Sequence, residues 1–403
     1  MAAGRAELAR RLAEAALRGD PAERLLERFA EGLDGLGVPL RRAFVTVPSL
    51  HPLLRARGFR WERDRAIGEA VDFARRRSAP DSNDEWAQSP LYPLYLGAED
   101  TLRYRVERGE GVDRFDLLHD LADEGVTDYL AYKRAFGEAG AGEGVISAWS
   151  TDRPGGFTAA EIDLLGALLP HLELAIEAHC LSWSSQSLLA TYLGQDVARR
   201  VLAGAVERGV GAPLDAVIWT SDLQGFTRLA DTEPSARVLD LLNAYSEATV
   251  AAIAQAGGEV SKFLGDGILA LFPMTTDAPS RALEAATSAL ASVRRLTAER
   301  REAALPVTAL RVALHRGEVV YGNVGSRDRL DFTVIGPAVN EATRLCDMCR
   351  SLDQALVVSE AFHAAAGDPV RFVGLGRYAL RGVERPQALF TLDAVVDAPS
   401  NCQ

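Results

Sequence analysis

The first part of the chain alternates short apolar strands with helical segments. Residues 1–36 carry apolar positions at helical spacing and predict two helices, separated at Asp20-Pro21. The run RAFVTV at 42–47 has the composition of a strand. The segment from Pro48 to about Gly111 is rich in proline and charge and has only weak periodicity, so it predicts no regular element.

A strand and a long helix are expected to close this first region. The alternating apolar run at 144–150 predicts the strand. Thr158 is placed to cap the next helix, and Glu161 three residues later completes a capping box. The helical pattern continues through 187–209, and a break within it is expected, if anywhere, near Ser182–Ser187. Such a helix suits either a core position or a connecting, dimer-forming role.

The second part of the chain, from about Val210, follows a different order. A buried strand, an amphipathic helix, a hairpin, a second helix and another strand are predicted at 214–222, 235–256, 259–272, 282–301 and 307–314. This β-α-β-β-α-β order is that of a ferredoxin-like split unit, so the fold class is α+β, an α/β sandwich. Further strands are expected at 317–325, 331–336 and 355–359, with a helix from Pro337 and two strands at the C-terminal end.

Composition narrows the classes of function. The 403 residues suffice for two or three domains, and 48% hydrophobic with 25% charged residues is a globular balance. A net charge of −12 disfavours broad binding to nucleic acid or anionic membranes. The sequence shows neither a signal peptide nor a run long enough for a membrane helix, so a cytoplasmic location is expected. Cys346 and Cys349 have metal-like spacing, but no second pair completes a site and they fall in a predicted helix.

Two aspartates interrupt core-like segments of the second region. Asp222 ends the first predicted strand, and Asp266 lies at the tip of the hairpin, in Gly265-Asp266-Gly267. In a ferredoxin-like unit these two places are adjacent, so the carboxylates would repel each other unless a cation joins them. Mg²⁺ or Mn²⁺ suits oxygen ligands of this kind, together with substrate phosphates. The alternative, a solvated turn aspartate, leaves Asp222 unexplained.

Other polar residues support phosphoryl-transfer chemistry. Asn340 and Arg344 are four residues apart and share one helix face, and an arginine there suits charge on a transferring phosphoryl group. Arg381 could hold a terminal phosphate or be an ordinary surface arginine. Lys262 and Thr333 are polar members of apolar strands, with side chains that can read a base edge.

Four segments, in order and spacing, resemble the catalytic domain of class III nucleotide cyclases. They are SDLQGFT at 221–227, KFLGDGILALF at 262–272, DFTVIGPAVNEATR at 331–344 and LGRYALRG at 375–382. The resemblance covers about 210–395 and implies a head-to-tail homodimer with sites at its interface. It implies ATP as substrate, cyclic AMP and pyrophosphate as products, and two Mg²⁺ or Mn²⁺ ions per site.

The resemblance also implies roles for single positions. Asp222 and Asp266 match the metal-binding aspartates, and the Leu223 carbonyl lies where a backbone ligand is expected. Lys262 matches the adenine-contacting lysine and Thr333 its partner. The remaining matches are Asn340 with the ribose-orienting asparagine, Arg344 with the transition-state arginine, and Arg381 with a position that commonly holds a triphosphate-binding lysine.

The N-terminal region gives a weaker resemblance. Residues 144–179 are similar to the closing strand and helix of a GAF domain, a sensor found with such cyclases. The expected organisation is a GAF-like regulatory domain at 1–180, a connecting, dimer-forming helix at 181–209 and the cyclase domain at 210–403. A small-molecule effector would then bind the first domain, although a purely structural dimerisation module is an equal alternative.

Several alternatives stay open at this point. A guanylate cyclase usually carries Glu and a small residue in place of Lys262 and Thr333, and pyrimidine cyclases also exist in this superfamily. A non-catalytic nucleotide-binding protein would normally have lost a metal aspartate or the Asn/Arg pair, and this chain retains all four.

Overall fold

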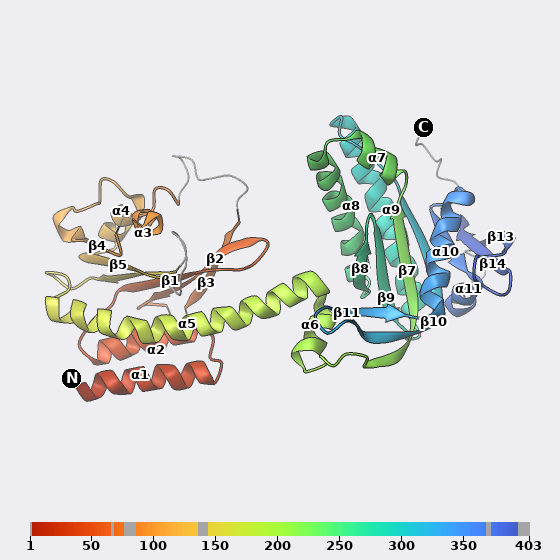
Figure 1. Cartoon of the computed structure of the whole chain (residues 1–403). Coiled ribbons are helices and arrows are strands. Elements are labelled where there is room, and N and C mark those ends of the chain that lie inside the picture. The colour runs from red at the N-terminus through yellow and green to blue at the C-terminus, as the bar shows by residue number, and fades with distance from the viewer. Residues whose placement is uncertain are drawn as a thin grey trace. The chain divides into compact units, whose positions relative to one another are not determined.

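A computed structural model shows two compact units, Met1–Leu188 and Leu189–Gln403 (Figure 1), and each is described by itself. The structure describes residues 2–65, 68–75, 86–97, 99–135, 144–367 and 372–393. Part of the segment EWAQSPLYPLYLG lies outside these ranges, at residue 85.

The first unit is built on a six-stranded antiparallel sheet with the order β3-β2-β1-β6-β5-β4. The predicted strands at 42–47 and 144–150 are its two central members. The segment from Pro48 to Gly111, for which no regular element was predicted, supplies edge strands. The strands are β1 Arg42–Pro48, β2 Leu54–Glu62, β3 Glu69–Ala74, β4 Thr101–Tyr104, β5 Asp128–Arg134 and β6 Val145–Thr151.

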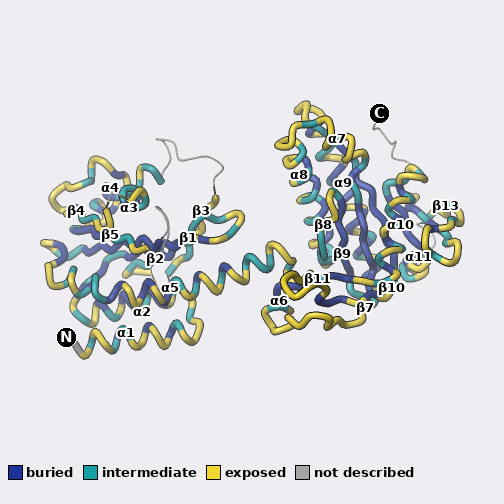
Figure 2. Tube along the Cα trace, viewed as in Figure 1, coloured by how far each residue is buried: buried dark blue, intermediate teal, exposed yellow. Residues whose placement is uncertain are grey.

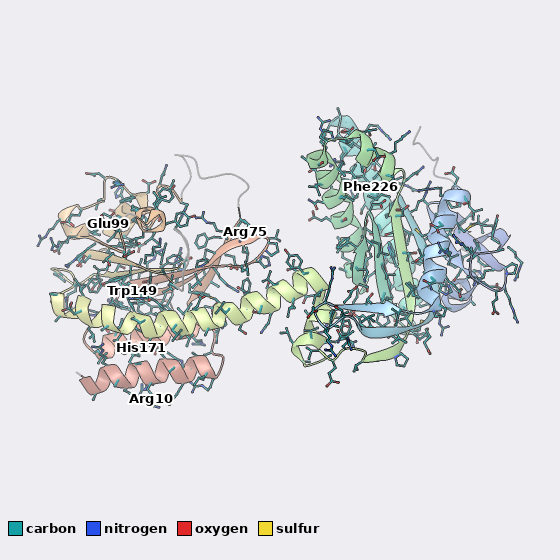
Figure 3. All side chains as sticks on the ribbon, in the orientation of Figure 1. Arg10, Arg75, Glu99, Trp149, His171 and Phe226 are labelled. Carbon is teal, nitrogen blue, oxygen red and sulfur yellow. The ribbon has the colours of Figure 1, made fainter. Side chains whose placement is uncertain are left out.

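Helices cover both faces of this sheet because its strands alternate their side chains between two cores. Trp149 faces a core with α1 (Ala2–Leu17), α2 (Ala22–Gly35) and α5 (Ala159–Leu193), while Ala148 faces the opposite core (Figure 3). That opposite core is closed by α3 Tyr92–Leu96, the 3₁₀ turn Val106–Arg108 and α4 Asp116–Asp123. The two predicted N-terminal helices, separated at Asp20-Pro21, are confirmed.

The long helix α5 begins where the capping box placed it. The Thr158 backbone N–H donates to Glu161 Oε2 at 2.8 Å, and the Glu161 N–H donates to Thr158 Oγ1 at 3.3 Å. The break expected near Ser182–Ser187 is wrong: α5 runs unbroken to Leu193. A serine in this stretch can hydrogen-bond to the helix backbone without breaking it: Ser185 Oγ donates to the Leu181 carbonyl, four residues earlier.

The chain instead turns at Gly194, whose φ of 88° is easily adopted by glycine, before the short helix α6, Gln195–Leu202. By length and composition alone, α5 could cross a membrane, and 44% of its most apolar 18-residue window is buried. A core helix passes the same test.

The second unit confirms the predicted β-α-β-β-α-β order. Its elements to this point are β7 Gly211–Leu223, α7 Phe226–Thr232, α8 Ser235–Gln255, β8 Glu259–Leu264, β9 Gly267–Pro273, α9 Ala278–Glu302 and β10 Leu310–Gly325. The two strands expected at 307–314 and 317–325 are one strand, β10, which pairs with β7 from Leu310 to Gly322. An intervening glycine at 317 does not interrupt that ladder.

The rest of this unit extends the same sheet, whose order is β13-β14-β12-β10-β7-β9-β8, with β11 paired to β10. The added elements are β11 Leu330–Ile335, α10 Pro337–Ser351, β12 Leu356–Ser359, α11 Glu360–Ala366, β13 Phe372–Tyr378 and β14 Gln387–Leu392. Helices α8 and α9 pack on one face, against Trp219, and α10 packs on the other, against Ile218 (Figure 2). Alternation along β7 therefore decides which side chains face α10.

Candidate active site

Asp222 and Asp266 lie side by side, as the topology predicted. Ser221 of β7 pairs with Ile268 of β9, which brings the turn before β9 to the end of β7. The Leu223 backbone N–H donates to Asp266 Oδ2 at 3.3 Å. Glycine is needed beside Asp266, because a Cβ at Gly267 would lie 2.4 Å from the Ser221 carbonyl oxygen.

The electrostatics of this pair suit a cation. The pKa of Asp222 is raised to about 6, first by burial and then by the hydrogen bond and negative charge of Asp266. Arg350 and the Leu223 N–H act in the opposite direction. Two half-buried carboxylates beside a backbone carbonyl are hard oxygen donors of the kind that Mg²⁺ and Mn²⁺ bind. Among the described residues, no group of three or more His, Cys, Asp or Glu side chains forms a metal cage. Water and substrate oxygens would therefore complete the coordination.

Arg311 is a candidate site residue that sequence reasoning missed. In the β7–β10 ladder it lies directly opposite Asp222, so both side chains leave the sheet on the α10 face. The residue is only 7% exposed. A buried guanidinium at this position of the ladder suits a phosphate-bearing ligand. The available signal was a charge inside the apolar run LRVAL at 310–314.

An ion pair links the strands that carry the two predicted base-reading residues, Lys262 and Thr333. Lys262 on β8 forms an ion pair with Asp331 on β11, two residues before Thr333. Thr333 is buried and pairs with Gly322 of β10. Strands distant in sequence thus present a lysine, an aspartate and a threonine at one place.

Asn340 and Arg344 lie on the outer side of α10. The inner side of that helix is fixed to the sheet by buried Ala338, Ala342 and Leu345, and Thr220 Oγ1 of β7 donates to the Ala342 carbonyl at 2.8 Å. Asn340 is exposed, and Arg344 is partly exposed and, among the residues that the structure describes, forms an ion pair only with Asp347, at 3.3 Å. Both polar ends are therefore available to a ligand.

The structure does not join Arg381 to these groups. It is exposed in the turn that follows β13, and it has no hydrogen-bond or ion-pair partner among the described residues. Its assignment to a phosphate stays a prediction.

The sheet registers of Thr333 and Asp222 lead to different positions along β7. Gly322, the partner of Thr333, pairs with Gly211, at the opposite end of β7 from Asp222. Eleven residues of strand separate these positions, or about 36 Å along the strand at ~3.3 Å per residue. Gly211 therefore lies at the other end of β7 from the metal-edge residues (Asp222, Leu223, Asp266), whereas Lys262 pairs with Leu269, opposite Thr220, and lies toward the Asp222 end.

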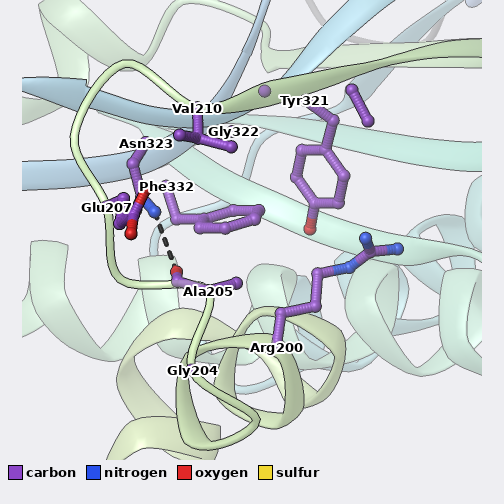
Figure 4. A pocket seen from close by; sticks show the side chains of 11 residues that line it. Arg200, Gly204, Ala205, Glu207, Val210, Tyr321, Gly322, Asn323 and Phe332 are labelled. Carbon is purple, nitrogen blue, oxygen red and sulfur yellow. Dashed lines mark hydrogen bonds between the residues drawn. The ribbon is translucent and has the colours of Figure 1, made fainter.

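A pocket of the second unit lies away from Asp222. It has a volume of about 290 Å³ and sits between the α6–β7 linker and the β10–β11 hairpin (Figure 4). Arg200 lies 5.2 Å from the Tyr321 ring centroid, and Asn323 Nδ2 donates to the Ala205 carbonyl at 2.8 Å. These contacts fasten the linker to the hairpin.

Comparison with known families supplies the identification. Residues 214–393 match the family described as the adenylate and guanylate cyclase catalytic domain. This unit is a class III nucleotide cyclase domain. Its fold and its family were both anticipated from the four sequence segments, and both are confirmed.

Known proteins similar to this cyclase leave its substrate base open. Two uncharacterized proteins of Mycobacterium tuberculosis, Rv1319c and Rv1320c, are 32% and 34% identical over 206 and 208 residues. These alignments cover 51% and 50% of this chain but only 37% and 35% of the relatives, so the chain spans about a third of their length. A bacterial light-regulated adenylyl cyclase matches in fold, with a TM-score of 0.50, 20% identity and coverage of 63% of this chain and 82% of that one.

The raised pKa of Asp222 predicts that the stability of the cyclase domain, and its stabilisation by Mg²⁺, both change with pH. Because the folded-state pKa of Asp222 is about 6, against an ordinary 3.8, its contribution to stability is full below about pH 4 and lost as pH rises to about 6. Binding of Mg²⁺ requires the ionised form, so the rise in melting temperature caused by Mg²⁺ should grow over the same interval. Melting temperatures recorded with and without Mg²⁺ between about pH 4 and pH 6 measure both effects.

Asp222→Asn is the matched control for this pH effect, since it removes the titrating proton and keeps the shape. In this variant, both the melting temperature and its increase on addition of Mg²⁺ should vary less with pH than in the unmodified protein. An Mg²⁺-induced shift that is the same at both ends of the interval in the unmodified protein would contradict the assignment.

Proposed function

We propose that this cyclase converts ATP to 3′,5′-cyclic AMP and pyrophosphate, at sites shared by two subunits. The observation that carries the proposal is the pair of adjacent carboxylates, Asp222 and Asp266, on a fold that also brings Lys262 against β11. The carboxylate pair of Asp222 and Asp266 suits metal ions and a triphosphate, and Lys262 with its neighbours on β11 suits a purine. Lys262 and Thr333 favour ATP over GTP.

Two Mg²⁺ or Mn²⁺ ions, held by Asp222, Asp266 and the Leu223 carbonyl, would activate the ribose 3′-hydroxyl and neutralise the triphosphate. The 3′-oxygen forms a bond to the α-phosphorus, the bond from that phosphorus to the bridging oxygen breaks, and the hydroxyl proton passes to solvent. Arg344 donates hydrogen bonds to the phosphoryl oxygens, and Asn340 orients the ribose from the same helix face. Arg311, buried opposite Asp222, holds the triphosphate from the metal side.

A head-to-tail homodimer brings these two groups of residues together. In that arrangement the metal edge of one subunit faces Lys262, Thr333, Asn340 and Arg344 of its partner. A two-fold dimer repeats the contact, so it has two sites.

The exposed side of α5 supports a dimer independently. From 164 to 193 this helix contains no lysine or arginine, and its two glutamates, Glu173 and Glu177, are buried or half-buried. The outward positions alternate by four and three residues, as in a heptad seam. They are Leu174, Ala178, Leu181, Ser185, Leu188 and Tyr192, of which Leu174 and Tyr192 are 64% and 74% exposed. An uncharged stripe of this kind suits a second copy of the same helix.

We also propose that the first unit regulates the second. Its separate sheet and cores support an independent domain, in keeping with the GAF-like domain expected at 1–180, the connecting helix at 181–209 and the catalytic domain at 210–403. A small-molecule effector of that unit and a cytoplasmic location are parts of the same proposal.

A product assay tests the function. Purified protein is given ATP, GTP, CTP or UTP, each with Mg²⁺ and with Mn²⁺, and cyclic nucleotide and pyrophosphate are measured. Cyclic AMP and pyrophosphate in equal amounts, from ATP alone, are expected. Cyclic GMP as the main product would replace the adenylate assignment with guanylate. Absence of every product, both from the full chain and from residues 205–403, would favour a nucleotide-binding protein without turnover.

A further inference from the structure

A buried polar cluster lies between α10 and the sheet of the second unit. Its centre is His315 of β10, which is 5% exposed. Side chains alternate along a strand, so His315 leaves β10 on the same face as Ala313, which shares an apolar core with Leu345 of α10. The histidine is joined by polar contacts to three other elements, through Ser359 of β12, Glu341 of α10 and, by way of that glutamate, Gln387 of β14.

The contacts of His315 determine which ring nitrogen carries the hydrogen. Burial lowers the pKa of His315, although the charge of Glu341 acts in the opposite direction, so the imidazole is neutral at pH 7. Ser359 Oγ accepts the Phe362 N–H at 3.1 Å and lies 2.9 Å from His315 Nδ1. The Ser359 hydroxyl can then donate its own hydrogen to Nδ1. This leaves the ring hydrogen on Nε2, which lies 3.7 Å from Glu341 Oε2.

Glu341 receives donors from two strands. Its Oε2 accepts a hydrogen bond from Gln387 Nε2 at 2.6 Å and has His315 Nε2 on another side. In the sheet order, β12 separates the strands of these two donors. Only 23% of the Glu341 side chain is exposed, and hydrogen bonds to a partly desolvated carboxylate are among the stronger ones.

These contacts fall within the helical turn that carries the proposed catalytic groups. Asn340 directly precedes Glu341, and Arg344 follows three residues later. The next residue, Ala342, accepts a hydrogen bond from Thr220 Oγ1 of β7 at 2.8 Å. Apolar packing of a helix on a sheet is non-directional, whereas hydrogen bonds at two adjacent positions are directional. They therefore determine how this turn is rotated and how close it lies to the sheet.

A direct chemical role for the cluster does not fit its burial. Ser359, His315 and Glu341 are the residue types of a hydrolytic triad, but Ser359 is fully buried and its Oγ caps α11. A nucleophile has to reach its substrate. The cluster can therefore act only through the helix that it supports.

We propose that Glu341 is a positioning residue: held by His315 and Gln387, it fixes the turn of α10 that presents the catalytic groups. The proposal rests on the proposed function, in which Asn340 orients the ribose and Arg344 donates to the phosphoryl oxygens. Misplacing such groups by about 1 Å can cost about 10²-fold in rate. A defect of this kind lowers kcat and leaves KM nearly unchanged, because it removes interactions made in the transition state.

Glu341→Ala and Gln387→Ala test the proposal from both sides of their hydrogen bond. In the full chain, kcat for cyclic nucleotide formation should fall about 10- to 100-fold in Glu341→Ala and about 10-fold in Gln387→Ala, with KM changed less than about threefold. The double variant should be no worse than Glu341→Ala alone, because both changes remove the same contact. Glu341→Gln keeps an oxygen that can accept from Gln387, so it should regain most of the activity.

Glu360→Ala is the matched control. Glu360 is exposed, and its Oε2 accepts the Ala388 N–H at 3.4 Å, so this change removes a contact between another helix and β14 without altering α10. Its kcat should match that of the unmodified protein. If Glu341→Ala and Gln387→Ala lower the melting temperature but keep kcat within about twofold, the glutamate is merely structural and the proposal is overturned. Equal loss of activity in Glu341→Gln and Glu341→Ala would overturn it as well.

Amide hydrogen exchange of residues 337–351 separates this proposal from the proposed function. Absence of cyclic product from every nucleotide with the unmodified protein would mean that the proposed function fails. Exchange then still tests how α10 is held. Faster exchange across α10 in Glu341→Ala and Gln387→Ala than in Glu360→Ala supports the positioning role, and equal protection in all three variants overturns it.

Discussion

Asp266→Asn is expected to abolish turnover while leaving the fold intact. Asparagine keeps an oxygen that can accept the Leu223 N–H, so the turn between β8 and β9 should survive. It removes one of the two negative charges that face the metal position. Metal-ion catalysis contributes several kcal/mol of transition-state stabilisation, so kcat should fall by about a thousandfold or more.

The measurement is Mg²⁺- and Mn²⁺-dependent formation of cyclic nucleotide, with circular dichroism and a thermal melt to establish folding. Asp231→Asn is the matched control, because this exposed aspartate lies nearby on α7, outside the proposed site. It should be as active as the unmodified protein. Full metal-dependent turnover in folded Asp266→Asn would remove this residue from the metal site.

Mixing two inactive variants is expected to restore activity, which is the second large effect. Arg344→Ala should lose about 10²- to 10³-fold in kcat, as for removal of a donor to developing charge. Within the described part of the chain its one ion pair is an exposed one with Asp347, so the stability cost should be small. After subunit exchange with Asp266→Asn, half of the dimers are mixed, and each mixed dimer holds one intact site and one doubly altered site. About a quarter of full activity should return if sites are shared across a two-fold axis.

Asp222→Asn mixed with Asp266→Asn is the control for this experiment. Both changes affect the metal edge, so every site in the mixed dimer remains damaged and no activity should return. Differently tagged subunits establish that mixed dimers form. If Arg344→Ala and Asp266→Asn form mixed dimers that stay inactive, each site is contained in one chain and the shared arrangement is wrong.

Local signals in the sequence were sufficient for much of the cyclase unit. The glycines around Asp266 predicted a tight turn, and the structure requires one of them, because a side chain at Gly267 would collide with the Ser221 carbonyl. The capping box at Thr158 and Glu161 fixed the start of α5. The end of α5 was predicted less well, because a cluster of serines weakens helix propensity without breaking the hydrogen-bond ladder.

Local sequence signals could not predict which residues from distant parts of the chain lie next to each other. Arg311 looks like an isolated charge in an apolar strand until the β7–β10 register places it opposite Asp222. Asp331 likewise carries no local signal of its partner, since Lys262 is 69 positions away. Strand register depends on the packing of both sheet faces, which no short segment encodes.

The sequence by itself determined the β-α-β-β-α-β order of the second unit, the family, and the pair of aspartates at a strand end and a turn, because propensity, periodicity and turn chemistry act over a few residues. The tertiary structure alone decided which side chains meet. It raised the pKa of Asp222 by burial beside Asp266, buried Thr333 while leaving Asp331 accessible, and placed Arg311 opposite Asp222. Burial and proximity arise only when distant strands pack, so they are properties of the folded sheet.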